Sequence, residues 1–503
     1  MEYILTAEEM KQCDSYTIEH FHVPSIVLME RAALKCVASM MRAKFDFTRV
    51  LVVCGSGNNG GDGYAIARLL NERGVSVDIL STGIITSMSP ETRENYESCI
   101  SYKIPVKSSI RDDDYTLVVD AMFGVGLNRE LEKKTIYYID LINDLKKKGA
   151  NVVAVDIPSG INASNGKVMG AAVKADMTVT FAYYKKGLML YPGADYAGKV
   201  VLADIGITKE SLNEEMLSLS ALTKHDLLKA DFLKRKNYSN KSTYGKVLLI
   251  VGNEEMSGCA VLAATSCFRC GAGMVRVFTH ENNKSIISDK LPEAMIDTYD
   301  DNLDMNKLSE AVKWSDVIGI GPGIGRNKLA KTIFEFVFFK ASSPIVIDAD
   351  AIHILKQYRM TLKNEKDKDI IITPHIGEMS DFTGLSKSEL LDELIENSLD
   401  AAYLYNLTCV CKDARTIIAS QYGDYRINIT GNNGMASAGM GDCLLGIICA
   451  LRARTDDSFE AASFGAYIHG LAGDLAAEKV GKAGLLATDL INELKTCLEA
   501  CDE

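Results

Sequence analysis

The side chains best suited to chemistry in the first half of the chain lie in one glycine-rich stretch, Cys54 to Gly63, which reads CGSGNNGGDG. The apolar residues 50–53 before it predict a buried strand, and the apolar spacing after it predicts a helix from Asp62 to Arg73. Glycines let the backbone approach an anion closely, and the free N–H groups at a helix start point toward it. The stretch therefore predicts a cradle for the phosphate of a nucleotide or of another phosphorylated ligand.

This stretch allows two functional interpretations. Residues 55–60 satisfy the GxGxxG pattern and Asp78 lies near the distance of a ribose-binding acid, which together are typical of a dinucleotide oxidoreductase. The second interpretation is a cation site, and it rests on Asn58, Asn59 and Asp62. Phosphate binding needs only backbone N–H groups, whereas these side chains add carbonyl and carboxylate oxygens, which are the ligands that a hard cation prefers. Taken one at a time, these residues could equally cap turns and the helix start.

Two other candidates follow separate predicted strands. Asp120 begins the motif DAMFGVG, and Ser159 lies in DIPSG, which begins at Asp156. In a sheet of parallel strands, the carboxyl ends of the strands meet at one edge, and ligands collect there. The convergence of three such motifs favours a shared site with a bound cation over three unrelated caps.

A second glycine-rich helix start lies in the other half of the chain, where residues 438–446 read AGMGDCLLG. The backbone N–H groups of Gly439, Met440 and Gly441 can hold a phosphate, and Asp442 can accept the proton of a substrate hydroxyl. A phosphoryl-transfer enzyme needs this combination of donors and base. The alternative is a glycine-rich turn in which Asp442 is only a cap.

Three further motifs accompany this helix start: GPGIG at 321–325, TPHIGE at 373–378 and CKDART at 411–416. His375 follows an apolar strand pattern and is surrounded by proline, glycine and glutamate, which favours a functional role over a purely structural one. Lys412 follows another apolar strand and is suited to a nucleotide phosphate, although an exposed turn lysine would look the same.

The composition excludes several classes of protein. The chain has 503 residues, enough for two or three domains, and its formal charge of −12 argues against a general binder of nucleic acid or of anionic membranes. The N-terminal residues lack the pattern of a signal peptide, and the longest apolar run, 443–451, is about half of what a membrane span needs. The thirteen scattered cysteines indicate reduced thiols in the cytoplasm, and the lone CxxC of Cys267 and Cys270 is more typical of core packing than of redox or metal chemistry.

Strand and helix patterns alternate along both halves and predict a mainly parallel α/β fold with two domains. Expected strands of the first half lie at 49–54, 75–80, 116–120, 151–155, 176–182 and 199–204. Those of the second half begin at Gly245 and continue at 316–325, 344–351, 369–378 and 408–413, with a hairpin at 416–420 and 425–429. The pattern weakens between them, so we place domains at 1–212 and 241–503 and a linker at 213–240.

The first half resembles the NAD(P)H-hydrate epimerases of the YjeF N-terminal family. The motifs LTAEEM, LMERAA, CGSGNNGGDGYAIAR, VDAMFGVGL and VDIPSGINASNG follow in family order over residues 1–210. The resemblance implies a Rossmann-like three-layer α/β/α domain, a K⁺ ion held by Asn59, Asp120 and Ser159, and Asp120 as the carboxylate that moves protons. The implied substrate contacts are Asn58, Asn59, Gly60, Gly61, Asp62, Gly124, Val125, Gly126, Leu127, Asn128, Arg129, Glu130 and Asp156.

The second half resembles the ribokinase-like NAD(P)H-hydrate dehydratases, because GPGIG, DADA, TPHIGEM and GNNGMASAGMGDCLLG appear in family order over residues 230–500. Ile376 and Asp413 depart from the family, which commonly has proline and glycine there. The resemblance implies Asp442 as catalytic base, ADP or ATP as co-substrate, and Mg²⁺. The implied hydrate contacts are Ala260, Gly323, His375 and Asp442, and the implied nucleotide contacts are Lys412, Asp413, Ala414, Arg415, Thr416 and Gly441.

The resemblance therefore implies one bifunctional enzyme, an isomerase and a lyase, that repairs NADHX and NADPHX. The first site would interconvert the R and S hydrates, and the second would dehydrate the S form with ADP, which the bacterial fused enzymes generally use, or with ATP. It also implies a cytoplasmic, homo-oligomeric protein without nucleic-acid or membrane partners. Two alternatives remain: a vitamin or sugar kinase with an accessory nucleotide-binding domain, and a sensor in which one half has lost catalysis.

Overall fold

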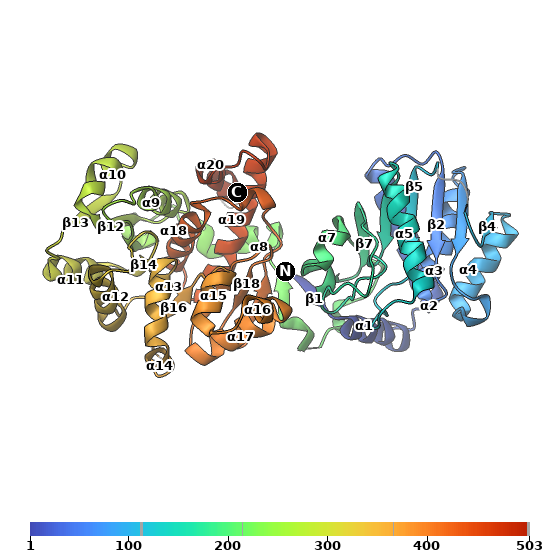
Figure 1. Cartoon of the computed structure of the whole chain (residues 1–503), viewed down its shortest axis with the longest axis horizontal. Helices are drawn as coiled ribbons and strands as arrows, with labels where there is room; N and C mark the ends of the chain where they lie inside the picture. Colours follow the sequence, from blue (N-terminus) through green and yellow to red (C-terminus); the bar gives the residue numbers. More distant parts are fainter. Residues whose placement is uncertain (111–113, 214, 366, 500–503) are drawn as a thin grey trace. The chain divides into compact units, whose positions relative to one another are not determined.

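The computed structural model describes residues 1–110, 114–213, 215–365 and 367–499. The chain divides into two compact units, Glu2–Leu219 and Ser220–Glu503, and Met1 packs with the second (Figure 1). The division at 219 falls inside the range 213–240 expected for the linker. Each unit has an α/β fold of its own, as the alternating sequence pattern predicts.

A seven-stranded sheet organises the first unit, with the order β4-β3-β2-β5-β6-β7-β9 and every pair parallel. The strand order reverses direction between β2 and β5, which is the switch point where Rossmann-like sheets bind ligands. The strands are β2 (Val50–Cys54), β3 (Val77–Ser81), β4 (Val106–Lys107), β5 (Leu117–Ala121), β6 (Asn151–Val155), β7 (Met177–Phe181) and β9 (Lys199–Ala203). A short parallel pair, β1 (Glu2–Leu5) and β8 (Tyr184–Lys185), accompanies the sheet.

Helices cover both faces of this sheet because successive residues of a strand point to opposite sides. Val50, Val52 and Cys54 pack into one core with α2 and α3, whereas Leu51 and Val53 pack into another core with α5. The result is the expected three-layer arrangement. The helices are α1 (Ala7–His20), α2 (Ser25–Arg42), α3 (Asn58–Asn71), α4 (Pro90–Ser101), α5 (Lys133–Lys147), α6 (Lys186–Met189) and α7 (Gly193–Ala197).

The start of α3 corrects the sequence-based expectation. The helix begins at Asn58 with Gly57 as its N-cap residue, four residues before the expected start at Asp62, so Asp62 is not a cap. Glycine and asparagine are poor helix formers, which is why this segment resembles a loop in the sequence. Tertiary packing overrides that preference, because Gly61 lies directly against the Met29 side chain of α2.

The strands of the second unit pair in the order β13-β12-β11-β14-β15-β16-β17-β18-β19. The pairs are parallel as far as β17, and β17, β18 and β19 are antiparallel, which confirms the expected hairpin. The strands are β11 (Lys246–Ile250), β12 (Met274–His280), β13 (Met295–Tyr299), β14 (Val317–Ile320), β15 (Ile345–Ile347), β16 (Ile370–Ile372), β17 (Thr408–Cys411), β18 (Ile417–Ala419) and β19 (Tyr425–Ile427). Several are shorter than expected, because the motifs at their carboxyl ends leave the sheet.

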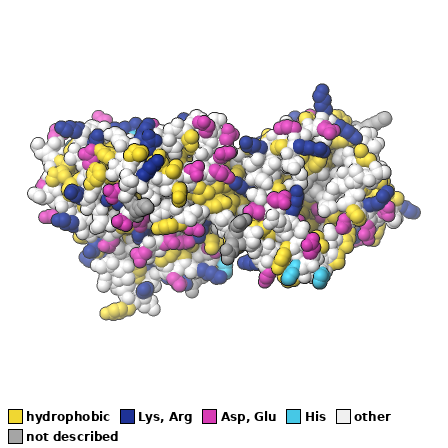
Figure 2. Space-filling model, turned by 90° about the horizontal axis from the view of Figure 1, so that it is seen from below, with side chains coloured by type: hydrophobic (Ala, Val, Ile, Leu, Met, Phe, Trp, Pro, Cys, Tyr) yellow, Lys and Arg dark blue, Asp and Glu magenta, His cyan; other side chains and the backbone are white. Residues whose placement is uncertain are grey.

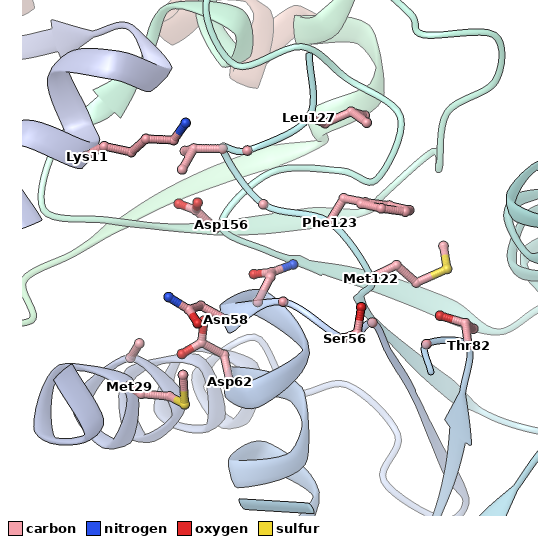
Figure 3. A pocket seen from close by; sticks show the side chains of 18 of the residues that line it. Lys11, Met29, Ser56, Asn58, Asp62, Thr82, Met122, Phe123, Leu127 and Asp156 are labelled. Atoms are coloured by element: carbon pink, nitrogen blue, oxygen red, sulfur yellow. The ribbon is translucent and has the colours of Figure 1, made fainter. Parts of the chain in front are cut away.

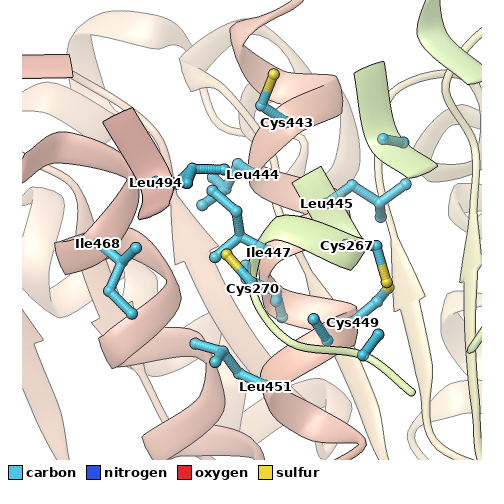
Figure 4. Packing of buried hydrophobic residues seen from close by; sticks show 14 of the residues in the cluster. Cys267, Cys270, Cys443, Leu444, Leu445, Ile447, Cys449, Leu451, Ile468 and Leu494 are labelled. Atoms are coloured by element: carbon cyan, nitrogen blue, oxygen red, sulfur yellow. The ribbon is translucent and has the colours of Figure 1, made fainter. Parts of the chain in front are cut away.

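The helices α9, α18, α19 and α20 share one hydrophobic core with a face of this sheet. Cys267 and Cys270 are fully buried in that core, beside residues such as Cys449 and Ile447, and the cysteines of the described residues are free thiols (Figure 4). The CxxC pair is therefore packing, as expected. The helices are α8 (Lys224–Lys229), α9 (Gly258–Arg269), α10 (Lys284–Lys290), α11 (Met305–Trp314), α12 (Lys328–Lys340), α13 (Asp350–Leu355), α14 (Arg359–Leu362), α15 (Ile376–Thr383), α16 (Lys387–Asp392), α17 (Leu394–Tyr405), α18 (Met440–Arg452), α19 (Ser458–Val480) and α20 (Ala487–Glu499).

Acidic and basic side chains are interspersed on the face of the molecule seen in Figure 2. Among the described residues, none of the helices is both long enough and apolar enough to cross a bilayer. Within the same residues, no three His, Cys, Asp or Glu side chains form a group that could hold a metal ion.

Gly446 of α18 tests how closely the helices of the second core pack. A Cβ atom at this position would lie 2.1 Å from the carbonyl oxygen of Ala263 in α9, so Gly446→Ala forces the helices apart. We expect a loss of about 1–3 kcal/mol in the free energy of unfolding, measured by urea denaturation. Gly484→Ala is the control, because the nearest atom to its Cβ would be 3.7 Å away. Equal stability of the two variants would contradict the close packing.

Candidate functional site

A cavity of about 730 Å³ opens at the carboxyl ends of β2 and β5 in the first unit (Figure 3). It lies at the switch point of the sheet, where the expected motifs converge. The expected ligand-contacting residues that line it are Asn58, Asn59, Asp62, Gly124, Val125, Gly126, Leu127, Arg129, Glu130 and Asp156. Gly60, Gly61 and Asn128 belong to the same segments but do not line the cavity.

Two glycines bring the walls of this cavity together. A Cβ atom on Gly55 would lie 2.1 Å from the carbonyl oxygen of Met122, and a Cβ atom on Gly60 would lie 2.1 Å from the carbonyl oxygen of Gly55. The segment after β2 therefore touches both the loop after β5 and the first turn of α3. Only glycine fits at these two contacts, and the N–H groups at the start of α3 are thereby brought to the cavity.

Asp120 and Ser159 form a buried pair, as the sequence predicts, but they lie behind the cavity wall. The Asp120 carboxylate is fully buried and accepts hydrogen bonds from the Ser159 hydroxyl at 2.6 Å, the Ser159 amide at 2.8 Å and the Met122 amide at 3.3 Å. The Ser159 hydroxyl in turn accepts from the Phe123 amide at 3.0 Å. Burial raises the pKa of Asp120 to about 6, and the hydrogen bonds from Ser159 limit the increase.

Asn59, the third expected cation ligand, has a side-chain amide that is buried and makes no hydrogen bond within the described residues. A buried amide without a partner is costly, so it points to a ligand that the protein alone does not supply. A Cβ atom on Gly124 would lie 3.4 Å from the Asn59 side chain, which places Asn59 against the loop after β5. The amide, carboxylate and hydroxyl oxygens of Asn59, Asp120 and Ser159 are the donor types that a K⁺ ion takes.

Asp78, the expected ribose-binding acid, is paired with other side chains outside the cavity. Its Oδ2 atom accepts hydrogen bonds from Lys107 at 2.9 Å and Tyr115 at 2.7 Å, and Arg49 lies 3.5 Å away. These partners lower the pKa of Asp78 against the opposing effect of burial. Asp78 does not line the cavity, so the oxidoreductase interpretation loses its ribose ligand.

Sequence reasoning missed two charged residues that lie on the cavity wall close to Asp156. Asp14 of α1 and Lys185 of β8 line the wall near Asp156, and Lys185 forms an ion pair of 2.8 Å with Asp156. Neither residue lies in a glycine-rich motif, which is why the sequence analysis did not select them. The one sequence signal for a buried Lys185 is that it follows an apolar strand.

The second unit brings Asp348, Lys412 and the GxGD helix start together. Lys412 Nζ lies 2.7 Å from the Asp348 carboxylate, and a Cβ atom on Gly441 would lie 3.5 Å from both groups. Asp442 occupies the first turn of α18, and burial together with the charge of Asp348 raises its pKa to about 6, while Lys412 opposes this shift. Asp348, in the DADA motif, is a site residue that the residue-level prediction omitted.

The other expected residues of this unit lie around the same strand ends. His375 caps α15 through Nδ1, which accepts from the amides of Gly377 and Glu378, and its backbone bridges to Lys412. A Cβ atom on Gly323 would lie 2.7 Å from the sulfur of Cys259, the neighbour of the buried Ala260. Among the expected nucleotide contacts that follow Lys412, Asp413 and Ala414 are exposed, and Arg415 and Thr416 are half-buried.

The Ser159 hydroxyl links two buried groups behind the first cavity, because it donates a hydrogen bond to the Asp120 carboxylate and accepts one from the Phe123 amide. We expect Ser159→Ala to lower the free energy of unfolding by about 1–3 kcal/mol, since it strands two buried polar groups. Urea denaturation checks this value. Ser101→Ala is the control, because Ser101 is exposed and bonds only within α4. A Ser159→Ala protein as stable as the control would contradict the structural role of this hydroxyl.

Comparison with solved structures identifies the fold of the second unit. A ribokinase-like superfamily protein from Enterococcus faecalis is 28% identical over 57% of this chain and 97% of its own, with a TM-score of 0.52. A protein from Streptococcus mutans is also 28% identical, over 56% of this chain and 100% of its own, with a TM-score of 0.50. The expected ribokinase-like fold is confirmed.

Two family models match the two halves. The model described as YjeF-related protein N-terminus matches residues 25–187, and the model described as NAD(P)H-hydrate dehydratase matches residues 247–496. Curated relatives span the whole chain. The bifunctional NAD(P)H-hydrate repair enzyme of Moorella thermoacetica is 34% identical over 100% of this chain and 97% of its own length. The enzyme of the same name from Escherichia coli is 33% identical over 93% of this chain and 88% of its own length. With both halves matched in order along one chain, the protein belongs to the family of bifunctional NAD(P)H-hydrate repair enzymes.

Proposed function

We propose that this chain repairs hydrated NADH and NADPH with two active sites, one in each unit. The first interconverts the R and S hydrates, and the second dehydrates the S hydrate at the expense of ADP or ATP. The observation that carries this proposal is that one chain holds both family halves, each with its own constellation of carboxylates at the strand ends. The fusion is chemically sensible, because a dehydratase that accepts only the S hydrate would leave the R hydrate unrepaired.

In the dehydratase half, Asp442 accepts the proton of the C6 hydroxyl while the hydroxyl oxygen attacks the terminal phosphorus of the nucleotide. The phosphorus–oxygen bond to the leaving nucleotide breaks, and the N–H groups at the start of α18 hold the transferred phosphate. The C6–O bond then breaks with loss of phosphate and of the C5 proton, and the ring regains its double bond. Phosphorylation is needed because hydroxide itself is a poor leaving group.

Lys412 supports this chemistry through its charge. Its Nζ atom forms an ion pair with Asp348 at 2.7 Å and lies beside Gly441. The ammonium group can therefore also pair with a nucleotide phosphate bound at the start of α18. Asp348 and Asp442 are carboxylates of the kind that hold Mg²⁺, and a bound Mg²⁺ would supply charge neutralisation of the phosphates. We infer nucleotide contacts at Lys412, Asp413, Ala414, Arg415, Thr416 and Gly441, and hydrate contacts at Ala260, Gly323, His375 and Asp442.

In the epimerase half, we propose that Asn59, Asp120 and Ser159 hold a K⁺ ion. The partnerless amide of Asn59 and the oxygen-rich Asp120–Ser159 pair support this assignment. A K⁺ ion would supply positive charge beside the bound nucleotide. Of the two roles expected for Asp120, cation ligand and proton carrier, its position behind the cavity wall supports the first. The family resemblance further leads us to propose a cytoplasmic homo-oligomer that prefers ADP.

A single assay tests the two-site proposal. Purified protein is mixed with racemic NADHX and ADP or ATP, and NADH is followed by its absorbance. We expect complete return to NADH, because the first site resupplies the S hydrate. Conversion that stops at half would show that the epimerase half is inactive. Absence of NADH, with phosphorylation of a hydroxylated vitamin or sugar instead, would support the kinase alternative.

The Asp442 carboxylate is expected to act only in dehydration. Asp442→Asn should lower the dehydration rate by about 10²–10⁴-fold and leave epimerisation unchanged. In the wild type, dehydration should fall as the pH drops through about 6, because the base becomes protonated. Lys412→Met should move this fall to higher pH, since a nearby cation no longer favours the carboxylate.

Asp456→Asn, at an exposed carboxylate outside both sites, is the control and should change neither activity. Loss of both activities in a folded Asp442→Asn protein would overturn the assignment of separate sites.

A further inference from the structure

Four charged side chains on the wall of the first cavity form a group separate from the three residues proposed to hold the cation. They are Asp14 of α1, Asp62 of α3, Asp156 after β6 and Lys185 of β8. Figure 3 shows Asp62 on the side of α3 and Asp156 on the opposite side of the gap between them. The Asp120 carboxylate, in contrast, is fully buried and does not line the cavity. Groups that exchange protons with a substrate must reach it, so this cavity-lining group is better placed than Asp120.

The Asp156 carboxylate is held in one orientation. Its Oδ1 atom lies 2.8 Å from Lys185 Nζ and accepts a hydrogen bond from the Thr180 hydroxyl at 3.2 Å. Among the described residues no donor occupies Oδ2, which lies 3.3 Å from where a Cβ of Gly124 would stand. Asp156 also adopts a φ of +66°, a strained conformation for a residue with a side chain. One oxygen is therefore anchored while the other faces the loop that lines the cavity.

Lys185 is fitted to this orienting role. Its side chain is only 1% exposed, and Nζ donates to the Phe181 carbonyl at 2.7 Å as well as pairing with Asp156. Burying an ammonium group costs several kcal/mol unless close partners compensate for the lost water. Packing alone does not explain why a lysine is buried at the cavity wall and paired with one carboxylate, so this arrangement favours a functional role for Lys185.

Asp62 has an environment that contrasts with that of Asp156. Burial is the main cause that raises the pKa of Asp62 well above its usual range, and the charges of Asp156 and Asp14 add to it. Burial also raises the pKa of Asp14, to about 6, although Lys185 opposes the shift. A carboxyl group that holds its proton more readily than usual is suited to donate it, and Asp62 lies across the cavity from the Asp156 carboxylate that Lys185 anchors.

We propose that Asp62 and Asp156 are the catalytic acid and base of the epimerase site, and that Lys185 is the positioning residue that aims the Asp156 carboxylate at the substrate. This inference rests on the proposed epimerase function and deepens it.

The proton balance of the reaction closes without a co-reactant. Asp62 donates its proton to the C6 hydroxyl, the C6–O bond breaks with its electron pair on oxygen, and water leaves a cation delocalised between N1 and C6. Water then adds to the other face of C6, the new C–O bond forms, and its proton passes to Asp156. Proton transfer from Asp156 back to Asp62 restores the site, and the reverse epimerisation uses the same steps in reverse order.

The titratable and charged groups that face this pair come from every element around the cavity. They are Lys11 and Asp14 of α1, Cys36 of α2, Asp62 of α3, Arg129, Glu130 and Glu132 of the loop after β5, Lys134 and Tyr138 of α5, Asp156 after β6 and Lys185 of β8. Lys185 is the cation of this set that contacts Asp156. Removing its charge is therefore the most direct perturbation of the proposed base.

Lys185→Met tests the proposal because methionine keeps the length of the side chain without its charge. We measure conversion of (R)-NADHX to the S hydrate by chromatography, in the full chain and without nucleotide. We expect kcat to fall about 10- to 100-fold with KM nearly unchanged. The substrate still binds, but the Asp156 carboxylate is no longer held in the orientation that the reaction needs.

The same preparation supplies the control for protein concentration, because its dehydratase activity toward the S hydrate with ADP should equal that of the wild type, and an unchanged KM for epimerisation shows that the first unit is folded. Lys199→Met, at an exposed lysine on β9, is the matched control and should leave epimerisation unchanged. If Lys185→Met does not fold, Thr180→Val replaces it. That variant removes the other hydrogen bond to Oδ1 with little change in volume, and we expect a several-fold fall in kcat at unchanged KM.

Asp62→Asn should lower the epimerisation kcat by about 10²–10⁴-fold. A folded Lys185→Met or Thr180→Val protein with the wild-type kcat and KM would overturn the positioning role. A fully active Asp62→Asn protein would overturn the assignment of the acid. Failure of the wild type to epimerise the hydrate would instead overturn the proposed epimerase function.

Discussion

The first unit depends on one steric constraint, the contact of three backbone segments at Gly55. The carbonyl of Met122 approaches this residue from the loop after β5, and Gly60 in the first turn of α3 packs against it from the other side. Neither contact leaves room for a Cβ atom. The segments after β2 and β5 lie in direct backbone contact, and the start of α3, the Gly124 loop and Asp156 all border the same cavity. The chemistry of this half follows from that convergence.

The aspartates of the first unit have the same side chain, but they differ in how deeply they are buried and therefore in the role that each can take. Asp120 is enclosed, and three donors from Ser159 and Met122 compensate for its burial. It therefore ties two loops together and can contribute to a cation site with Asn59. Asp62 and Asp156 reach the cavity, where one is surrounded by other carboxylates and the other is paired with Lys185. The difference lies in their partners, since all three residues have the same intrinsic acidity.

The second unit achieves a comparable arrangement with a different fold. Asp348, His375 and Lys412 leave three neighbouring parallel strands, β15, β16 and β17, and α18 brings Gly441 and Asp442 to the same place. The helix that follows its GxGD turn packs closely, because Gly446 further along α18 lies against the backbone of α9. In both halves the glycines with functional importance are those that let a helix start approach another segment.

The sequence by itself determined the fold class, the two halves and the motifs that lie at the carboxyl ends of the strands in each sheet. This was possible because alternating periodicity reports which faces are buried, and because glycine-rich motifs at strand ends must share one edge of a parallel sheet. It could not place the start of α3 at Asn58, since local propensity opposes a helix there and only packing on Gly55 and Met29 imposes it. It could not separate Asp120 behind the wall from Asp62 and Asp156 on it. Nor could it show that Asp78 is sequestered by Lys107 and Tyr115, or that Lys185 is buried against Asp156. Those facts depend on which distant side chains meet, and only the tertiary structure decides that.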